Sequence, residues 1–399
     1  MFRLALALFS VQAGFHAFTA SLPVALAQAG VPDPEIGVVV GIAALVQIPA
    51  AFVAGVLVDR VGGLRAFMGG GFAYLAGCAV LLLPGVEPGG PMGPFVVARI
   101  FQGIGIAATL PAALSLVPRL VEPVRRGFGL AFVGSAHNLT LVIIPPLSLA
   151  VLMASSLHGV AVMATAFVIG GLIVVRIAPL PFLPASRTGA ASDGPGGIAR
   201  RRLGFAFRRP WASLIAIDLL FITHWGVVVA FLPQRAEAAG ANVGLFFVAD
   251  GVVILLARLP TGWLVDRMRP IVPIVIGLAA TGVAVILLSL PPATPLLVMA
   301  GAGTGVGGAL VITPLLVELS RRSGDADRGS AFSLLSAANA SALALGSIGG
   351  AVIVALTGFE VALLATLIGL VGAGLVATRD AGLHRLPIRA REVAAVADA

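Results

Sequence analysis

The chain has 399 residues, of which 59% are hydrophobic and 11% are charged, and its mean hydropathy is +1.08. Because a soluble globular domain carries ~25% charged residues, this composition excludes a soluble fold and places most of the chain in lipid. At ~20 residues per membrane-spanning helix, twelve spans would use ~240 residues and leave only short loops.

The net charge of +8 would suggest nucleic-acid binding in a soluble protein. Here the basic residues lie between apolar runs, so we expect them to set membrane topology and expect no nucleic-acid partner. All 25 of them are arginine, which together with the many Ala, Gly and Val residues indicates a GC-rich bacterial genome. The one cysteine, Cys78, lies in an apolar run, which excludes a disulfide framework and a thiolate metal site. We expect neither a metal nor a cofactor.

Apolar runs long enough to cross a membrane predict twelve helices, the first beginning almost at Met1. The small residues near Ala20 also fit a cleavable signal peptide, but cleavage would delete a helix that has a counterpart in the second half. We therefore predict an uncleaved first span. The expected spans are 4–26, 36–58, 64–83, 93–117, 127–153, 160–177, 212–232, 243–265, 271–290, 295–317, 329–356 and 361–377.

These spans predict an all-α integral membrane protein with two pseudo-symmetric six-helix bundles, over residues 1–183 and 210–378. Residues 184–209 are rich in Gly, Ser, Pro and Arg and predict a linker, and residues 379–399 predict a tail. Nearly all arginines outside the spans fall on one side, which the positive-inside rule identifies as the cytoplasm. We therefore expect both termini and the linker in the cytoplasm and the chain in the bacterial cytoplasmic membrane.

The opposite side of the predicted bundle has one arginine, Arg235, among acidic residues. These are Asp33, Glu35, Glu87, Glu237 and Glu360.

The two halves share residues at nearly constant spacing, and the spacing changes only across loops, where length can drift without disturbing packing. This behaviour distinguishes an internal repeat from chance similarity between apolar sequences. The matched residues are Pro23 with Pro233, Gly30 with Gly240, Gly37 with Gly244, Gly55 with Gly262, Asp59 with Asp266, Arg60 with Arg267, Gly103 with Gly305, Gly105 with Gly307 and Arg126 with Arg328.

One loop motif occurs in each half, at the cytoplasmic end of the second and eighth spans. Gly55 lies one turn before Asp59 on the same helix face, so a neighbouring helix can approach the backbone while Asp59 reaches its N-terminal amides. Gly62 permits a tight turn, and the arginines can pair with acidic residues or lipid headgroups. The motif residues are Gly55, Asp59, Arg60, Gly62 and Arg65, and in the second copy Gly262, Asp266 and Arg267.

This motif resembles the signature loop of the major facilitator superfamily, and the twelve spans with a central linker extend the resemblance over essentially the whole chain. The resemblance implies a secondary transporter in which the loop latches the outward-facing state and opens with the cytoplasmic side. A plain basic turn is the alternative. Gly63 and Leu64 depart from the family pattern, in which basic residues are usual, and Met268 to Pro270 replace the glycine turn in the second copy. We expect the second latch to be weaker.

Arg99 begins a run on the fourth span that is similar to another motif of this superfamily, in which the arginine is linked to proton movement. It lies too deep to reach the interface easily, so we expect it to face the cavity or a partner, whereas its second-half counterpart is Gly301. The fifth span lacks the Gly-Pro-x-x-Gly-Gly element of drug/proton antiporters, since Gly134 lies far from Pro145. Gly346 to Gly350 partly resembles that element, and close packing through small residues is the alternative.

Buried charges supply the candidates for proton coupling: Asp218, Asp250, Arg99 and Arg258. A charge at mid-bilayer costs ~2.5–3.5 kcal/mol and needs a partner, a water-filled cavity or neutralisation. Low dielectric favours the neutral form of a carboxyl group, which makes the two aspartates possible proton carriers. Asp250 and Arg258 are two turns apart on one helix, so their partners must lie on other helices. Permanent ion pairs among these four residues are the alternative.

If the bundle is of this family, the first, fourth, seventh and tenth spans line the path. The candidates for it are Gln12, His16, Gln102, His224 and Thr313. Either histidine could titrate near pH 7 or simply form a packing hydrogen bond. Glu318, close to Arg321 and Arg322, is more typical of a gate or surface pair than of a substrate ligand.

We expect a proton-linked exporter of a small organic molecule, such as a drug-like compound or secreted metabolite, that acts as a monomer. The alternative is an importer or facilitator of a sugar, organic acid or nucleoside, whose path would carry more hydrogen-bonding and aromatic groups than a chain with one tyrosine. Without lysine there is no Walker phosphate loop, so a gradient must supply the energy. The chain lacks metalloprotease and serine-hydrolase motifs, which disfavours an enzyme, and the buried acids disfavour a non-transporting scaffold or sensor.

Overall fold

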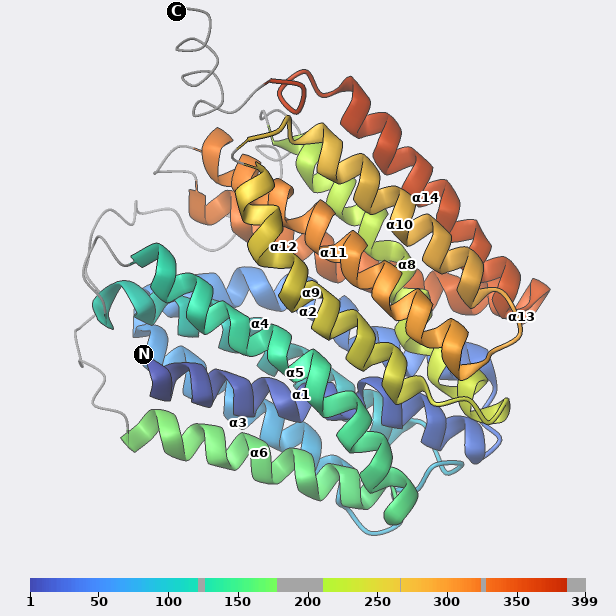
Figure 1. Cartoon of the computed structure of the whole chain (residues 1–399). Helices are drawn as coiled ribbons and strands as arrows, with labels where there is room; N and C mark the ends of the chain where they lie inside the picture. The colour runs from blue at the N-terminus through green and yellow to red at the C-terminus, as the bar shows by residue number, and fades with distance from the viewer. Residues whose placement is uncertain (121–125, 178–210, 266, 324–327, 386–399) are drawn as a thin grey trace, which may run out of the picture.

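The computed structural model describes residues 1–120, 126–177, 211–265, 267–323 and 328–385. The expected linker at 184–209 lies outside these residues. Figure 1 shows the helices of the first half, in blue to green, alongside those of the second half, in yellow-green to red. The first half contains α1 (Phe2–Gln28), α2 (Asp33–Val61), α3 (Gly63–Leu81), α4 (Gly93–Leu120), α5 (Arg126–Ala154) and α6 (Leu157–Ile177).

The second half repeats this arrangement. It contains α8 (Ala212–Ala238), α9 (Val243–Val265), α10 (Ile271–Leu288), α11 (Thr294–Arg322), α12 (Arg328–Ala344), η2 (Leu345–Gly349), α13 (Gly350–Thr357) and α14 (Phe359–Arg379). Eleven helical stretches are long and apolar enough to cross a membrane, with α12, η2 and α13 together forming one of them, and α9 contributes a shorter apolar stretch, Val243–Ala257. The prediction of an all-α membrane protein with twelve spans is confirmed.

Successive helices alternate in direction. We call the end of the bundle where α1 begins and α14 finishes the terminal end, and the end that holds the turns after α1, α8 and α13 the distal end (Figure 1). At the distal end, Gly30 and Gly240, which are matched in the two halves, have φ values of 81° and 67°. At the terminal end, Gly62 between α2 and α3 has a φ of 87°. Residues other than glycine rarely adopt these conformations, so these three turns depend on it.

The sequence repeat is reproduced in the packing of the fourth helix of each half on the second. A Cβ at Gly103 of α4 would lie 2.5 Å from the Ala43 carbonyl oxygen of α2, and a Cβ at Gly305 of α11 would lie 2.5 Å from that of Asp250 on α9. Ala43 and Asp250 are themselves equivalent positions, so a small residue meets the same backbone carbonyl in both halves. Small residues allow this close approach, which supplies packing energy where water does not drive association.

The eleventh span differs from the continuous helix that the sequence predicts. Its middle turn, η2, is a π-helix. Here a Cβ at Gly346 would collide with the Thr223 carbonyl oxygen and lie 2.8 Å from the Gly226 Cα, both on α8. Gly350 also packs on α8, where its Cβ would lie 3.1 Å from Val227 Cγ2. Close packing, the alternative for this glycine element, is therefore what the structure shows.

The residues that follow α14 pack against the second half rather than projecting from it. Leu383 is fully buried, and its carbonyl oxygen accepts a hydrogen bond of 3.1 Å from the Ile271 N–H at the start of α10. Arg322 Nη1 of α11 donates to Asp380 Oδ2 at 2.7 Å, and Ser213 Oγ of α8 donates to the same oxygen. The start of the expected tail thus joins α8, α10 and α11.

Glu318 lies in the same terminal-end cluster. Its carboxylate forms ion pairs with Arg321 at 3.1 Å and with Arg322 at 3.3 Å, one helical turn away. The pairing expected from the sequence is present, and the carboxylate is held at the end of α11.

We predict that Gly103→Ala and Gly305→Ala each lower stability by about 1–3 kcal/mol, because the added methyl group overpacks against a backbone carbonyl. Gly170→Ala is the matched control, since a Cβ there would meet no described atom within 4 Å. The measurement is thermal unfolding of the purified protein, followed by reaction of the buried Cys78 with a thiol-reactive dye. Equal midpoints for all three variants would contradict the close helix contact.

Asp380, just after α14, has a carboxyl group that is partly buried and hydrogen-bonded to Arg322. Partial burial raises the pKa of its carboxyl group, but the hydrogen bonds and charge of Arg322, with hydrogen bonds from Ser213 and Gly382, outweigh this effect and hold the pKa below the usual value. A carboxyl group with a lowered folded-state pKa stabilises the fold above its unfolded pKa and loses that contribution as pH falls through the folded-state value.

Asp380→Asn should therefore reduce stability by about 1.5–3 kcal/mol at pH 7, the contribution of a hydrogen bond to a charged group. The difference from wild type should shrink as the pH is lowered from 5 toward 3, in unfolding measured over that range. A difference that stays constant would show that the charge of Asp380 contributes nothing.

Candidate functional site

The candidate path residues of the first half form one polar cluster. Gln12 Nε2 on α1 donates to Thr109 Oγ1 on α4 at 3.5 Å, and Gln12 Oε1 accepts from His137 Nδ1 on α5 at 3.3 Å. The rings of His16 and His137 lie 5.3 Å apart. Sequence reasoning missed His137 because the fifth span was not assigned to the path. Its position about three turns into an apolar helix is the signal that could have found it.

Arg99 on α4 joins this cluster and is almost fully buried, with 6% of its surface exposed. Its Nε and Nη2 donate to the carbonyl oxygens of Val39 and Val40 on α2, at 3.3 and 3.0 Å. Its Nη1 donates to Gln102 Oε1 at 3.0 Å, and the guanidinium lies 5.3 Å from the centre of the Phe15 ring. Arg99 thus has its expected partners, and those that the structure identifies are neutral acceptors.

The second half has no arginine at the equivalent position. Gly301 occupies it, and a Cβ there would collide with the Phe246 carbonyl oxygen on α9. Phe246 is in turn the counterpart of Val39. In the first half, the Arg99 guanidinium therefore lies between α4 and α2. At the equivalent position of the second half, α11 and α9 pack directly against each other.

Asp250 is the buried acid of α9, with 4% of its surface exposed. Thr304 Oγ1 of α11 donates to Asp250 Oδ1 at 2.7 Å, so its partner lies on another helix, as expected. Thr304 and Gln102 are equivalent positions, as are Asp250 and Ala43. The side chain of Arg258 lies outside the described part of the structure.

Asp218 on α8 is also buried, with 2% of its surface exposed, and its Oδ2 has no hydrogen-bond partner among the described residues. His224, on the same helix, donates from Nδ1 to the Phe221 carbonyl oxygen and contacts the Phe221 and Trp225 rings. This intrahelical contact matches the packing alternative for His224. Thr313 is partly exposed on α11.

The loop motif lies at the terminal end of α2. A Cβ at Gly55 would meet no described atom within 4 Å, so none of the described residues makes the close approach that the spacing of Gly55 and Asp59 permits. Arg60 and Arg65 are exposed there, and Arg267 of the second copy is exposed just after α9. The side chain of Asp59, and Asp266 with the environment of Gly262, lie outside the described part.

At the distal end, polar side chains join the two halves. Asp33 at the start of α2 accepts a hydrogen bond of 2.8 Å from Gln234 and lies 3.7 Å from the Arg235 guanidinium, both on α8. Gln28 of α1 donates to Glu237 of α8 at 2.9 Å. We call these five residues the distal bridge.

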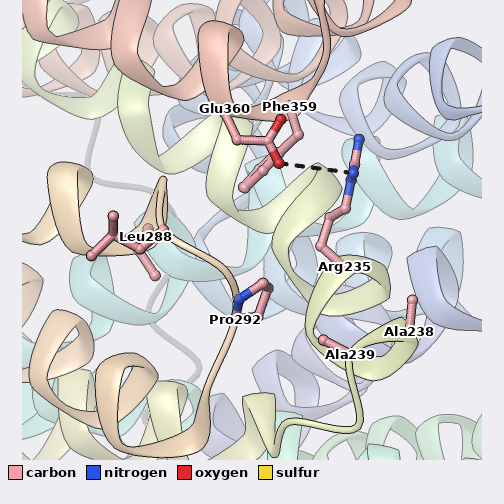
Figure 2. A pocket seen from close by; sticks show the side chains of 8 residues that line it. Arg235, Ala238, Ala239, Leu288, Pro292, Phe359 and Glu360 are labelled. Atoms are coloured by element: carbon pink, nitrogen blue, oxygen red, sulfur yellow. Dashed lines mark ion pairs between the residues drawn. The ribbon is translucent and has the colours of Figure 1, made fainter.

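The distal bridge continues into α14. Arg235 lies 4.0 Å from Glu360 and 5.5 Å from the centre of the Phe359 ring, beside a cleft of about 240 Å³ that Leu288 and Pro292 also line (Figure 2). From the sequence, these residues indicated only the orientation of the chain in the membrane. The position of Arg235 as the one arginine among the acidic residues of this end could have predicted the bridge.

Small residues bring the backbones together beneath the distal bridge. A Cβ at Gly37 of α2 would lie 2.6 Å from Ala351 Cβ and 2.8 Å from the Ser347 carbonyl oxygen. One turn further along α2, Gly41 packs against the Ser347 side chain and Ile348. The halves are therefore in direct contact at this end.

Comparison with known proteins gives a consistent picture. A sequence model of the Major Facilitator Superfamily matches residues 4–249 and 225–393. Among solved structures, a peptide transporter POT in complex with alafosfalin has a TM-score of 0.75 at 17% identity, covering 96% of this chain and 95% of its own. The nucleoside transporter NupG has a TM-score of 0.73 at 12% identity, covering 95% and 99%. A POT family transporter in complex with 5-aminolevulinic acid has a TM-score of 0.74 at 15% identity, covering 94% of each chain. At these identities the structures show a shared fold.

We predict that breaking the distal bridge exposes the interface beneath it. A Ser347→Cys reporter should react slowly with a membrane-impermeant thiol reagent, because Ser347 is 2% exposed. Arg235→Ala removes two ion pairs, each contributing up to about 1 kcal/mol, and should speed this reaction by roughly fivefold or more. The charge swap Asp33→Arg with Arg235→Asp should restore the slow rate. Equal rates in all three backgrounds would show that the bridge does not hold the halves together.

Proposed function

The chain belongs to the major facilitator superfamily, and from this membership we propose that it is a secondary active transporter that exports a small organic molecule in exchange for protons. The observation that carries the proposal is the unequal packing of the two ends. At the distal end the halves meet through the distal bridge and through Gly37 and Gly41, whereas Gly55 and Gly134 nearer the terminal end have no described atom within 4 Å of a Cβ. This difference supports alternating access, in which the halves rock about a site near the bilayer midplane.

The distribution of charge supports an orientation. Among the described residues outside the spans, Arg235 is the one arginine at the distal end, and the others lie toward the terminal end. By the positive-inside rule the terminal end is cytoplasmic, in the cytoplasmic membrane of a bacterium. The closely packed distal end then faces the outside, which supports a state closed to the outside.

The buried acids support proton coupling. Asp250 has a neutral hydroxyl as its described partner, and Asp218 Oδ2 has no described partner at all. Neither carboxyl group has the charge of an identified cation to keep it ionised, so each can take up and release a proton as its surroundings change during the cycle. A gradient must drive transport, because a chain without lysine has no Walker phosphate loop.

An importer or facilitator of a sugar, organic acid or nucleoside is the second candidate, and the likeness to a nucleoside transporter favours it. The apolar composition and single tyrosine favour export. The deciding experiment measures uptake and efflux in inverted vesicles under an imposed pH gradient, with lipophilic cations, antibiotics, sugars, nucleosides and organic acids. Uptake driven by an acidic lumen supports proton-coupled export; gradient-independent equilibration supports a facilitator; no flux of any compound contradicts both.

We predict that Asp250→Asn abolishes flux driven by the pH gradient but preserves exchange of substrate between the two sides. Asparagine keeps the shape and the hydrogen bond with Thr304 but cannot carry a proton. Glu87→Gln, at an exposed acid between α3 and α4, is the matched control and should leave coupling unchanged. Normal coupling in Asp250→Asn would assign Asp250 to structure.

A further inference from the structure

The polar cluster of the first half contains several buried groups with unused hydrogen-bonding capacity. His16 is 6% exposed and Gln102 and Tyr74 are fully buried, yet His16 Nε2, Gln102 Nε2 and the Tyr74 hydroxyl have no hydrogen-bond partner among the described residues. A buried polar atom without a partner costs ~1–3 kcal/mol, so three in one cluster require an explanation.

These groups lie around one aromatic ring. Phe15 is 5.4 Å from the His16 ring, 6.3 Å from the Tyr74 ring and 5.3 Å from the Arg99 guanidinium, measured to ring centres. Arg99 also holds Gln102, through the hydrogen bond from Nη1 to Oε1. The unused groups are therefore close to a buried cation.

The hydrogen-bond donors of this cluster have no negatively charged acceptor among the described residues. Arginine and the amide nitrogen of glutamine can only donate hydrogen bonds. The described partners of Arg99 are neutral oxygens, and no carboxylate of a described residue forms an ion pair with it. An isolated buried cation is costly in lipid, so a negatively charged acceptor nearby lowers the energy of the whole cluster.

His137 is the accessible member of this cluster. His137, which is partly exposed, joins it through Gln12 and His16. Further toward the distal end of α5, Val142 and Pro146 pack against Gly251 and Gly244 of α9 in the other half. His137 lies about one and a half turns to the terminal side of Val142 on the same helix, and its partial exposure makes it the member of the cluster that a solute reaches first.

We propose that this cluster is the subsite for the carboxylate of the substrate, with His137 at its entrance and the charge of Arg99 behind it. This deepens the proposed function and rests on it, because it assigns the transported molecules to small organic anions. The subsite belongs to the first half alone: in the second half Gly226, Gly301 and Asn339 occupy the positions of His16, Arg99 and His137.

The test compares matched probes on the full chain in lipid nanodiscs at constant ionic strength and pH 7. Acetate and benzoate are the carboxylates, and acetamide and benzamide are their uncharged counterparts. The readout is the ligand-dependent rise in unfolding temperature, which yields an apparent Kd for binding to the folded state. We expect the carboxylates to bind at least tenfold more tightly than the amides.

His137→Ala should weaken carboxylate binding at least tenfold, and Asn339→Ala, at the equivalent position of the second half, should change it less than twofold. Gln12→Leu is a second variant that breaks the link between His137 and the cluster, and it should weaken binding in the same direction. Equal protection by carboxylates and amides, or equal losses in His137→Ala and Asn339→Ala, would overturn the proposal.

The outcome is separable from that of the proposed function. Suppose that compounds without a carboxylate show gradient-driven flux and that binding shows no preference for carboxylates. This result would support the transport function and contradict the carboxylate subsite. Selective carboxylate binding without flux of any compound would support the subsite and contradict the transport mechanism.

Discussion

Lipid offers no hydrogen bonds, and every polar group inside this bundle must therefore find its partner within the protein or pay for burial in free energy. The helices satisfy their own backbones, which leaves the few polar side chains as the groups whose partners have to be explained. Arg99 shows how the constraint acts: its donors reach the carbonyl oxygens of Val39 and Val40, and this fixes α4 against α2. Asp250 and Thr304 make the equivalent connection between α9 and α11.

The same constraint separates structural groups from candidate functional ones. His224 satisfies its Nδ1 within its own helix, as the packing alternative predicts. Asp218 and His16 each keep a buried atom without a described partner, and in lipid such atoms are expected where a substrate, a proton or a changed conformation supplies what is missing. The two halves therefore share one helix arrangement but differ in their candidate coupling residues. The described ones are Arg99 in the first half and Asp218 and Asp250 in the second.

The helices and the two-half arrangement could be predicted from the sequence because both depend on local patterns, apolar runs and matched glycines. Gly103 and Gly305 were matched by their spacing alone, and the structure places the same close contact at both positions. The distal bridge could not be derived this way, since it joins Asp33 to residues two hundred positions away and depends on which helices meet. The contact of Gly346 with α8 depends likewise on which helices meet, whereas His137 was missed because the fifth span was not assigned to the path.

In alternating access, the two halves exchange contact at one end for contact at the other. Double electron–electron resonance between pairs of spin labels can follow this exchange in a Cys78→Ala background. One pair is placed at the exposed Ala29 and Ala239 of the distal end, and the other at the exposed Arg60 and Arg269 of the terminal end. As pH or substrate is varied, the distal distance should lengthen as the terminal distance shortens. Two fixed distances, or two distances that lengthen together, would contradict alternating access.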